Sequence, residues 1–186
     1  MNGTDRHTGL IMEFFATAAA RRSVRAYRGT AVEPDKLDRI LRTANLAPSA
    51  GDLQAYAIVA VRQAETRTVL AAAAHGQGFL AQAPVVLVFC SDPQRSAARY
   101  AERGKRLFSI QDATIAASHA QLAATALGLG CCWVGAFDER MVAQILAIPA
   151  GLHPVCMLTI GHAAEQPERT PRRPLSELVH QETFRT

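Results

Sequence analysis

The sequence has 186 residues, of which 49% are hydrophobic and 19% charged, values typical of a single globular domain and not of a disordered chain. Its 20 basic and 16 acidic residues give a net charge of +4, but the basic residues are spread along the chain without interleaved aromatics, which argues against a nucleic-acid binder. No apolar run reaches the roughly 18 residues of a membrane span, and residues 1–10 lack the apolar core of a signal peptide, so we expect a cytoplasmic protein.

Hydrophobic periodicity and turn residues predict alternating helices and strands along the chain. The expected helices cover 11–20, 33–44, 64–74, 110–127 and 138–146. The expected strands cover 56–61, 84–90 and 155–160, with a short apolar stretch at 131–134. The run 84–90 is apolar throughout, so we expect it at the centre of a sheet. Residues 95–109 are polar with periodic alanines, which is typical of a surface helix or lid.

This alternation predicts a sheet covered by helices. The interval between the second and third strands is too long for a simple crossover and favours a mixed sheet. Because the chain shows no repeat and no linker, residues 1–186 are expected to form one domain. Residues 1–10 are expected to be flexible, and the Pro- and Arg-rich segment 161–186 to form a C-terminal arm.

Several common active-site motifs are missing from the sequence. The cysteines form no C-x-x-C pair, and no histidine stands at zinc-ligand spacing from them, so we expect reduced core thiols and no metal site; they are Cys90, Cys131, Cys132 and Cys156. The sequence GLGCCW at 128–133 misses the dinucleotide fingerprint, because it follows a helix and ends in Trp instead of Gly. There is also no P-loop and no nucleophile elbow.

Four segments carry residue types that suit a flat, phosphorylated ligand. Residues 21–25 place three guanidinium groups and a hydroxyl together, and arginine is well shaped for bidentate contact with phosphate. The small-residue loop 47–56 lets a flat ligand approach the backbone, and residues 128–137 present backbone N–H groups with little obstruction. Residues 169–175 form a second basic cluster. Taken singly, the first segment also fits a solvated helix end, and the second an ordinary turn.

In this order and at this spacing, the four segments resemble the FMN-dependent nitroreductase family from residue 21 to about residue 180. The resemblance implies an α+β fold with three α/β/α layers around a central mixed sheet. It also implies a homodimer with FMN at the interface, in which the C-terminal arm extends onto the partner subunit. No catalytic side chain is expected, because FMN carries the redox chemistry.

The resemblance further implies which residues contact the flavin. The family's segment that binds the phosphate and ribityl chain of FMN corresponds to Arg21, Arg22, Ser23 and Arg25. The loop contributed by the partner subunit matches Pro48, Ser49, Ala50, Asp52 and Gln54, with Asp52 where the family has Asn. The segment beside flavin N5 matches Val134, Gly135 and Ala136. The second phosphate clamp matches Arg172, with Arg173 compensating for Thr170, where the family often has Lys or Arg.

The implied activity is transfer of hydride from NAD(P)H to FMN, followed by transfer of electrons to a nitro compound, a quinone or a flavin by a ping-pong mechanism. A specialised member of the family stays open as an alternative: a dehalogenase, a flavin-fragmenting enzyme or an azoline dehydrogenase. A non-catalytic flavin-binding protein is a further alternative. The sequence does not choose between NADH and NADPH, and it predicts no nucleic-acid or membrane partner.

Overall fold

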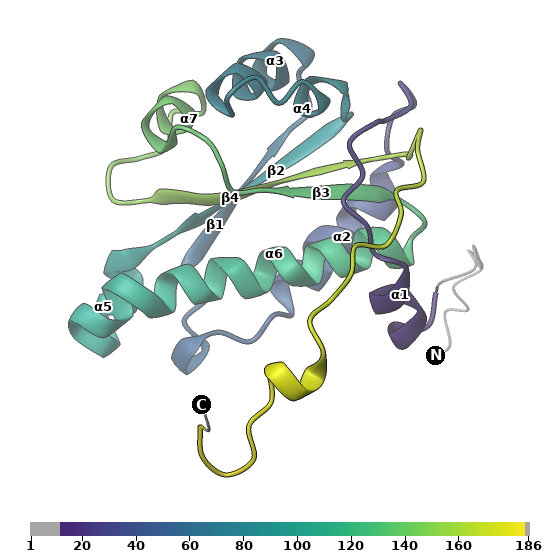
Figure 1. The fold of residues 1–186 in the computed structure, drawn as a ribbon. Helices are drawn as coiled ribbons and strands as arrows, with labels where there is room; N and C mark the ends of the chain where they lie inside the picture. The colour runs from purple at the N-terminus through teal and green to yellow at the C-terminus, as the bar shows by residue number, and fades with distance from the viewer. Residues whose placement is uncertain (1–11, 185–186) are drawn as a thin grey trace, which may run out of the picture.

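The computed structural model describes residues 12–184 and shows helices packed on both faces of a small sheet (Figure 1). Its strands are β1 (Tyr56–Val61), β2 (Val85–Ser91), β3 (Gly130–Val134) and β4 (His153–Gly161). Its helices are α1 (Phe14–Ala20), α2 (Pro34–Asn45), α3 (Ala64–Ala73), α4 (Phe79–Gln82), α5 (Pro93–Arg103), α6 (Ser109–Ala126) and α7 (Glu139–Ile145). Short helical turns are η1 (Ala50–Asp52), the π-helical η2 (Gly104–Phe108) and η3 (Leu175–Glu177). Residues 1–10, which are expected to be flexible, and residue 11, where a helix is expected to start, lie outside the described range.

The four strands lie in the order β1-β2-β4-β3. Every neighbouring pair in this order is antiparallel, so the prediction of a mixed sheet is wrong for the four strands. The parallel pairing found within residues 12–184 is the isolated bridge between Ser23 and Cys131. The long connection crosses over from β2 to β3, and these two strands run in the same direction. They do not pair, because β4 lies between them and is antiparallel to both. As predicted, β2 is central, and all seven of its residues are buried.

Alternate residues of the strands face two separate cores. On one face, Leu87, Phe89 and Leu158 pack with apolar residues of α2 and α6. On the other face, Val88 and Met157 pack with residues of α3, α4 and α7. The result is a three-layer α/β/α arrangement, with α3, α4 and α7 above the sheet and α2 and α6 below it in Figure 1. This arrangement confirms the predicted α+β fold.

The central helix α6 lies close to the sheet because its buried face consists of small side chains. Ala116, Ala117 and Ala120 are fully buried. At the last turn of α6, Ala126 O accepts a hydrogen bond from Met12 N–H at 3.3 Å, which ties the start of the described chain to this helix. Asp112 is also buried, with 2% of its surface exposed. One face of this alanine-rich helix is therefore buried, and Asp112 is a charged residue on it that the hydrophobic pattern did not single out.

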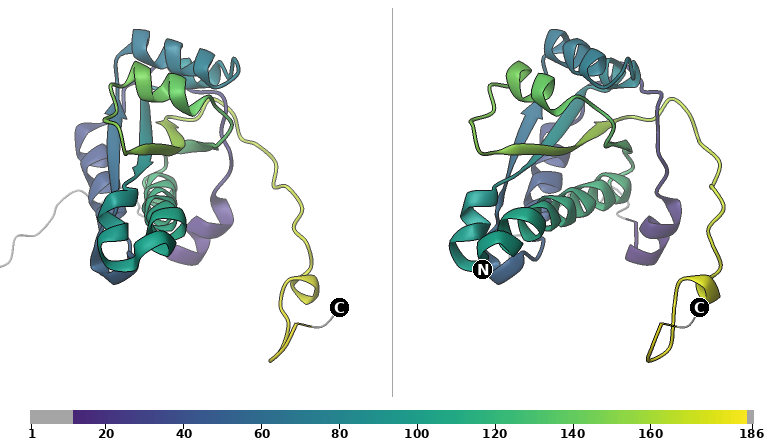
Figure 2. Two further views of the ribbon diagram at one scale, coloured as in Figure 1. Left: turned by 90° about the vertical axis from the view of Figure 1, so that its left-hand side faces the viewer. Right: turned by 60° about the vertical axis from the view of Figure 1, so that its left-hand side comes forward.

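The chain after β4 leaves the body of the domain as an extended segment, drawn in yellow in Figure 2. Several apolar side chains on it are exposed, among them Leu175 at 75% and Leu178 at 52%. Exposed apolar residues at this density are costly on a free surface.

All four cysteines are free and buried, and burial raises the pKa of the Cys131 thiol to about 11. Within residues 12–184, no group of three or more His, Cys, Asp or Glu side chains is placed to hold a metal ion. In the same range, no helix has the length and apolar character needed to cross a membrane.

Candidate functional site

The first arginine cluster is held in place by an extended segment that runs along β3. Val24 N–H donates to Cys131 O at 2.9 Å, and a Cβ at Gly130 would lie 2.9 Å from Val24 Cγ1. Glycine is therefore needed at position 130 for this close approach. Tyr27 is buried, and its hydroxyl lies 2.6 Å from both Val24 O and Thr159 Oγ1. Its burial raises the pKa of its phenol well above the usual range.

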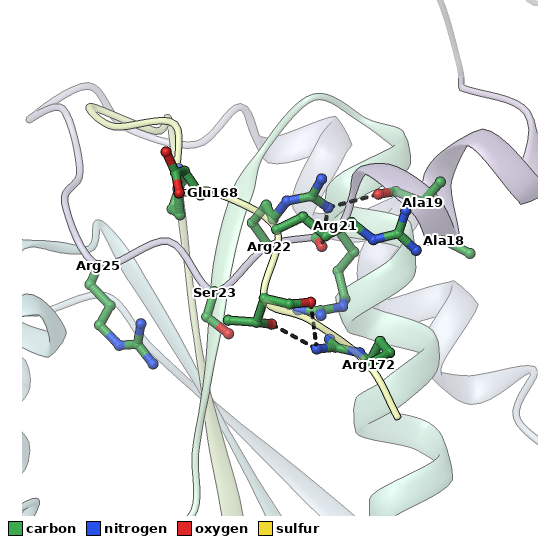
Figure 3. A pocket seen from close by; sticks show the side chains of 11 residues that line it. Ala18, Ala19, Arg21, Arg22, Ser23, Arg25, Glu168 and Arg172 are labelled. Atoms are coloured by element: carbon green, nitrogen blue, oxygen red, sulfur yellow. Dashed lines mark hydrogen bonds between the residues drawn. The ribbon is translucent and has the colours of Figure 1, made fainter. Parts of the chain in front are cut away.

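The same segment brings the start of the chain beside its C-terminal part. Tyr27 bridges to Ala163, and Glu165 accepts a hydrogen bond from the Arg25 N–H. Residues 167–172 then pass next to the end of α1 (Figure 3). Two basic clusters separated by more than 140 positions in the sequence therefore lie together.

A pocket of about 250 Å³ lies between these two segments. Four of the predicted residues on the first segment line it together with Arg172 on the second; they are Arg21, Arg22, Ser23 and Arg25. Figure 3 shows Arg21 and Arg22 beside the end of α1, Arg172 opposite them, and the guanidinium of Arg25 set apart on the other side of Ser23. The pocket is therefore rich in permanent positive charge.

The arginine side chains in this pocket bond to nearby carbonyl oxygens and keep donors to spare. Arg22 Nη1 donates to Ala19 O at 2.7 Å and to Arg21 O at 2.9 Å. Arg172 Nη1 donates to Thr170 Oγ1 at 2.7 Å. Because a guanidinium has five N–H donors in a planar fork, these contacts orient each group and leave other N–H groups for an anion. This donor set fits a phosphate.

The second basic cluster differs in detail from its sequence prediction. Arg173 lies outside the pocket, where its Nε pairs with Glu177 at 3.0 Å. Arg169 lines the pocket instead, as does the carboxylate residue Glu168. Arg169 belongs to the predicted basic cluster but was not singled out, because an extended segment gives no periodicity that tells which side chains face inward.

The predicted loop 48–54 lies at the other end of α6. Asp112 Oδ1 accepts from Ala50 N at 2.9 Å, and its Oδ2 from Ala55 N at 3.3 Å. Asp112 is in the first turn of α6. Ala126, which accepts a hydrogen bond from Met12 just before α1, is in the last turn. At 1.5 Å per residue these two points are about 20 Å apart, so one chain does not bring the loop and the arginine pocket together.

The backbone of this loop is strained, and side chains within it support the strained conformation. Asp52 has φ 58° and Gln54 has φ 44°, values that residues other than glycine rarely adopt. Gln54 Nε2 donates to Asp52 Oδ1 at 2.6 Å, and Ser49 Oγ accepts from Gln54 N at 3.0 Å. Asp52 and Gln54 are thus paired with each other, while Pro48 and Asp52 are exposed.

The predicted segment after β3 combines a buried anchor with an exposed turn. Val134 is 2% exposed and belongs to the core, whereas Gly135 and Ala136 are exposed. Gln77 Nε2 donates to Ala136 O at 3.0 Å, which fixes the turn against the end of α3. A Cβ at Gly135 would lie no closer than 3.6 Å to a neighbouring side chain, so the turn is open on that side.

Comparisons of the sequence with known proteins match it to one family. A model of the nitroreductase family matches residues 18–78 and 71–162. The chain is 31% identical to the FMN reductase (NAD(P)H) of Bacillus subtilis, over 92% of this chain and 74% of that protein. It is 30% identical to the NADPH-flavin oxidoreductase of Vibrio harveyi, over 90% of this chain and 73% of that protein.

Solved structures of two oxidoreductases also superpose on this chain. The NADPH:FMN oxidoreductase of Vibrio harveyi, complexed with NAD+, superposes with a TM-score of 0.86 at 28% identity, covering 93% of this chain and 78% of that one. An FMN-dependent nitroreductase of Clostridium difficile superposes with a TM-score of 0.77 at 29% identity, covering 91% of this chain and 99% of that one.

Proposed function

The chain belongs to the nitroreductase family, and we propose that its arginine pocket binds the phosphate of FMN. It is an NAD(P)H-dependent oxidoreductase with FMN as cofactor, as in its relatives. The observation that carries the proposed binding site is the meeting of Arg21, Arg22 and Arg172 from opposite ends of the chain around one pocket.

Each part of the proposed site has a separate task. The arginines hold the phosphate at any physiological pH, since guanidinium groups keep their charge. Ser23 adds a hydroxyl donor beside them. The open turn at Gly135 and Ala136 lets the flavin edge approach backbone atoms without a side chain in between. FMN, when bound, supplies the chemistry: it accepts hydride from NAD(P)H and passes electrons to the second substrate.

We further propose a homodimer in which the loop 48–54 of one subunit completes the site of the other. Asp112, which holds the loop, and Ala126, which accepts from Met12 just before α1, lie about 20 Å apart along α6, and this separation favours a contribution from a second copy. An apolar groove of about 520 Å³ runs along the outer side of α6, lined by residues that include Phe14, Leu122 and Ala126. The exposed Leu175 and Leu178 of the C-terminal segment would then gain a partner surface, in keeping with the expected arm.

The proposed electron acceptor is a nitro compound, a quinone or a flavin, since these are small, flat and able to stack on an open flavin face. A cytoplasmic location agrees with the four free thiols, which persist in a reducing compartment. A homodimer in the cytoplasm with NAD(P)H as reductant is therefore the full proposal.

A fluorescence titration tests the binding site. FMN fluorescence is followed as the cofactor-stripped protein is added, with riboflavin, which lacks the phosphate, as the matched ligand. We expect riboflavin to bind much more weakly than FMN. Equal affinities for the two would show that the arginine pocket does not hold the phosphate.

A further inference from the structure

One strongly basic segment of the molecule is not used by the proposed FMN site. Residues 93–108, which form α5 and η2, contain five basic residues and one acidic residue. The resulting net charge of +4 equals that of the whole chain, so the rest of the sequence is neutral overall. The basic residues are Arg95, Arg99, Arg103, Lys105 and Arg106, and all five are exposed.

These cations are not used in ion pairs. Within residues 12–184, the ion pairs join other residues and include none of the five. Instead, Arg99 and Arg103 lie against aromatic rings, with Arg99 Cζ 5.6 Å from the centre of the Tyr100 ring and Arg103 Cζ 5.4 Å from that of Phe108. Stacking on a ring restricts a guanidinium while leaving its N–H edges available.

The backbone here is also unusual. Ala101 has φ 47° and ψ −138°, a conformation that an L-residue adopts only under strain. The next residues, Gly104–Phe108, form a π-helical turn, and such turns occur frequently at functional sites. A Cβ at Gly104 would lie 2.6 Å from Ser96 O, so this turn is packed tightly against α5.

The charged segment is joined to the loop that the proposed dimer places at the flavin. Arg95 Nε donates to Leu53 O, and Arg99 Nη1 donates to Gly51 O at 3.3 Å. Gly51 also packs against Tyr100, because a Cβ at this position would lie 2.4 Å from the Tyr100 hydroxyl. An anion bound by this segment would therefore lie next to the loop 48–54.

We propose that Arg99 and Arg103, which lie against the contacting rings of Tyr100 and Phe108, bind the 2′-phosphate of NADPH, so that the protein prefers NADPH to NADH. This inference rests on the proposed function, because it requires the nucleotide to approach a flavin beside the loop 48–54. NADPH and NADH share the diphosphate and differ only in the 2′-phosphate, a doubly charged group near pH 7. Guanidinium groups that are not engaged in ion pairs discriminate by that charge.

The test compares both nucleotides in the FMN-loaded protein and in the variant Arg103→Ala; the hydrogen bonds to the loop come from Arg95 and Arg99. We expect the KM for NADPH to rise at least about tenfold, while the KM for NADH and the FMN content change less than twofold. Arg140→Ala is the control, since Arg140 is equally exposed but lies on α7, on the other face of the sheet. Equal changes for both nucleotides, or no preference for NADPH in the unaltered protein, would overturn the inference.

A binding measurement separates this inference from the proposed function. Calorimetry with adenosine 2′,5′-bisphosphate and with adenosine 5′-monophosphate requires no turnover. We expect the bisphosphate to bind more tightly, and this difference to decrease in Arg103→Ala. If the protein holds FMN but oxidises neither nucleotide, the proposed function fails while the calorimetry still decides on the arginines; equal binding of the two adenosine phosphates would refute their role.

Discussion

Arg172 enters the proposed phosphate site from the C-terminal segment, and its guanidinium is oriented by Thr170. We predict that Arg172→Ala weakens FMN binding by about 10- to 100-fold, because a hydrogen bond to a charged group contributes about 1.5–3 kcal/mol. A flavin titration measures this loss. Arg28→Ala is the control, since Arg28 is exposed and does not line the pocket. Unchanged affinity in Arg172→Ala would remove this residue from the site.

Asp112 holds the loop 48–54 through two backbone N–H groups while it is almost fully buried. In Asp112→Asn, the new amide N–H₂ would face one of these donors and leave it without an acceptor. We predict a loss of about 1–3 kcal/mol in the free energy of unfolding, measured by urea denaturation, and faster amide exchange at Ala50 or Ala55.

The matched control for this prediction is Asp138→Asn. Asp138 also accepts from a backbone N–H, that of Met141 at 2.9 Å, but it is an exposed N-cap. Because Asn caps helices as well as Asp does, we expect little change in stability. A similar loss in both variants would show that burial of Asp112 is not what makes its carboxylate important.

Among the elements, α6 connects the two halves of the proposed dimeric site, and its outer side forms the apolar groove. Ala123 lines this groove. We predict that Ala123→Glu shifts the protein from dimer to monomer in light scattering, because burying a carboxylate at the interface carries a desolvation cost. Flavin should be lost together with the dimer. Gln111→Glu, exposed on the same helix but outside the groove, should remain dimeric; a dimeric Ala123→Glu would refute the interface.

The sequence predicted those elements whose hydrophobic pattern is long enough to be read. The strand β1 has the predicted bounds, and α7 lies within one residue of the predicted range at each end. The helix α4 was missed, because its four residues are too few to show a period of 3.6. The antiparallel pairing was also missed, since a strand's partner depends on contacts far away in the sequence.

In the candidate site, too, local patterns were predictable from the sequence and contacts between distant segments were not. The first arginine cluster and Arg172 were predicted as separate segments, and the structure places them around one pocket. Local patterns did not distinguish Arg169 from Arg173, because an extended segment has no period that shows which side chains face the pocket; Arg173 instead pairs with Glu177 at the short turn η3. The role of Asp112 could not be predicted from the sequence either. A single carboxylate in an alanine-rich helix shows no function by itself, and only the fold brings the N–H groups of the loop to it.

At the scale of the whole molecule, the buried thiols predict how stability depends on pH. Burial raises the pKa of Cys90 to about 11 and that of Cys156 to about 12, from 9.0. Above pH 9 the unfolded chain loses these protons while the folded chain keeps them, so the free energy of unfolding falls as pH rises. We predict a Tm that decreases steadily from pH 8 to pH 11 in thermal scans. A constant Tm over this interval would contradict the prediction.

The central claim is that this fold binds FMN through its arginine pocket and reduces it with NAD(P)H. The most direct measurement is the absorption spectrum of the purified protein before and after anaerobic addition of NADPH, with mass spectrometry of the cofactor released by heat. We predict a yellow protein whose flavin bands bleach on addition of NADPH and whose released cofactor has the mass of FMN. A protein that stays colourless after incubation with FMN, one that releases FAD, or one whose bound flavin resists both NADPH and NADH would contradict the account.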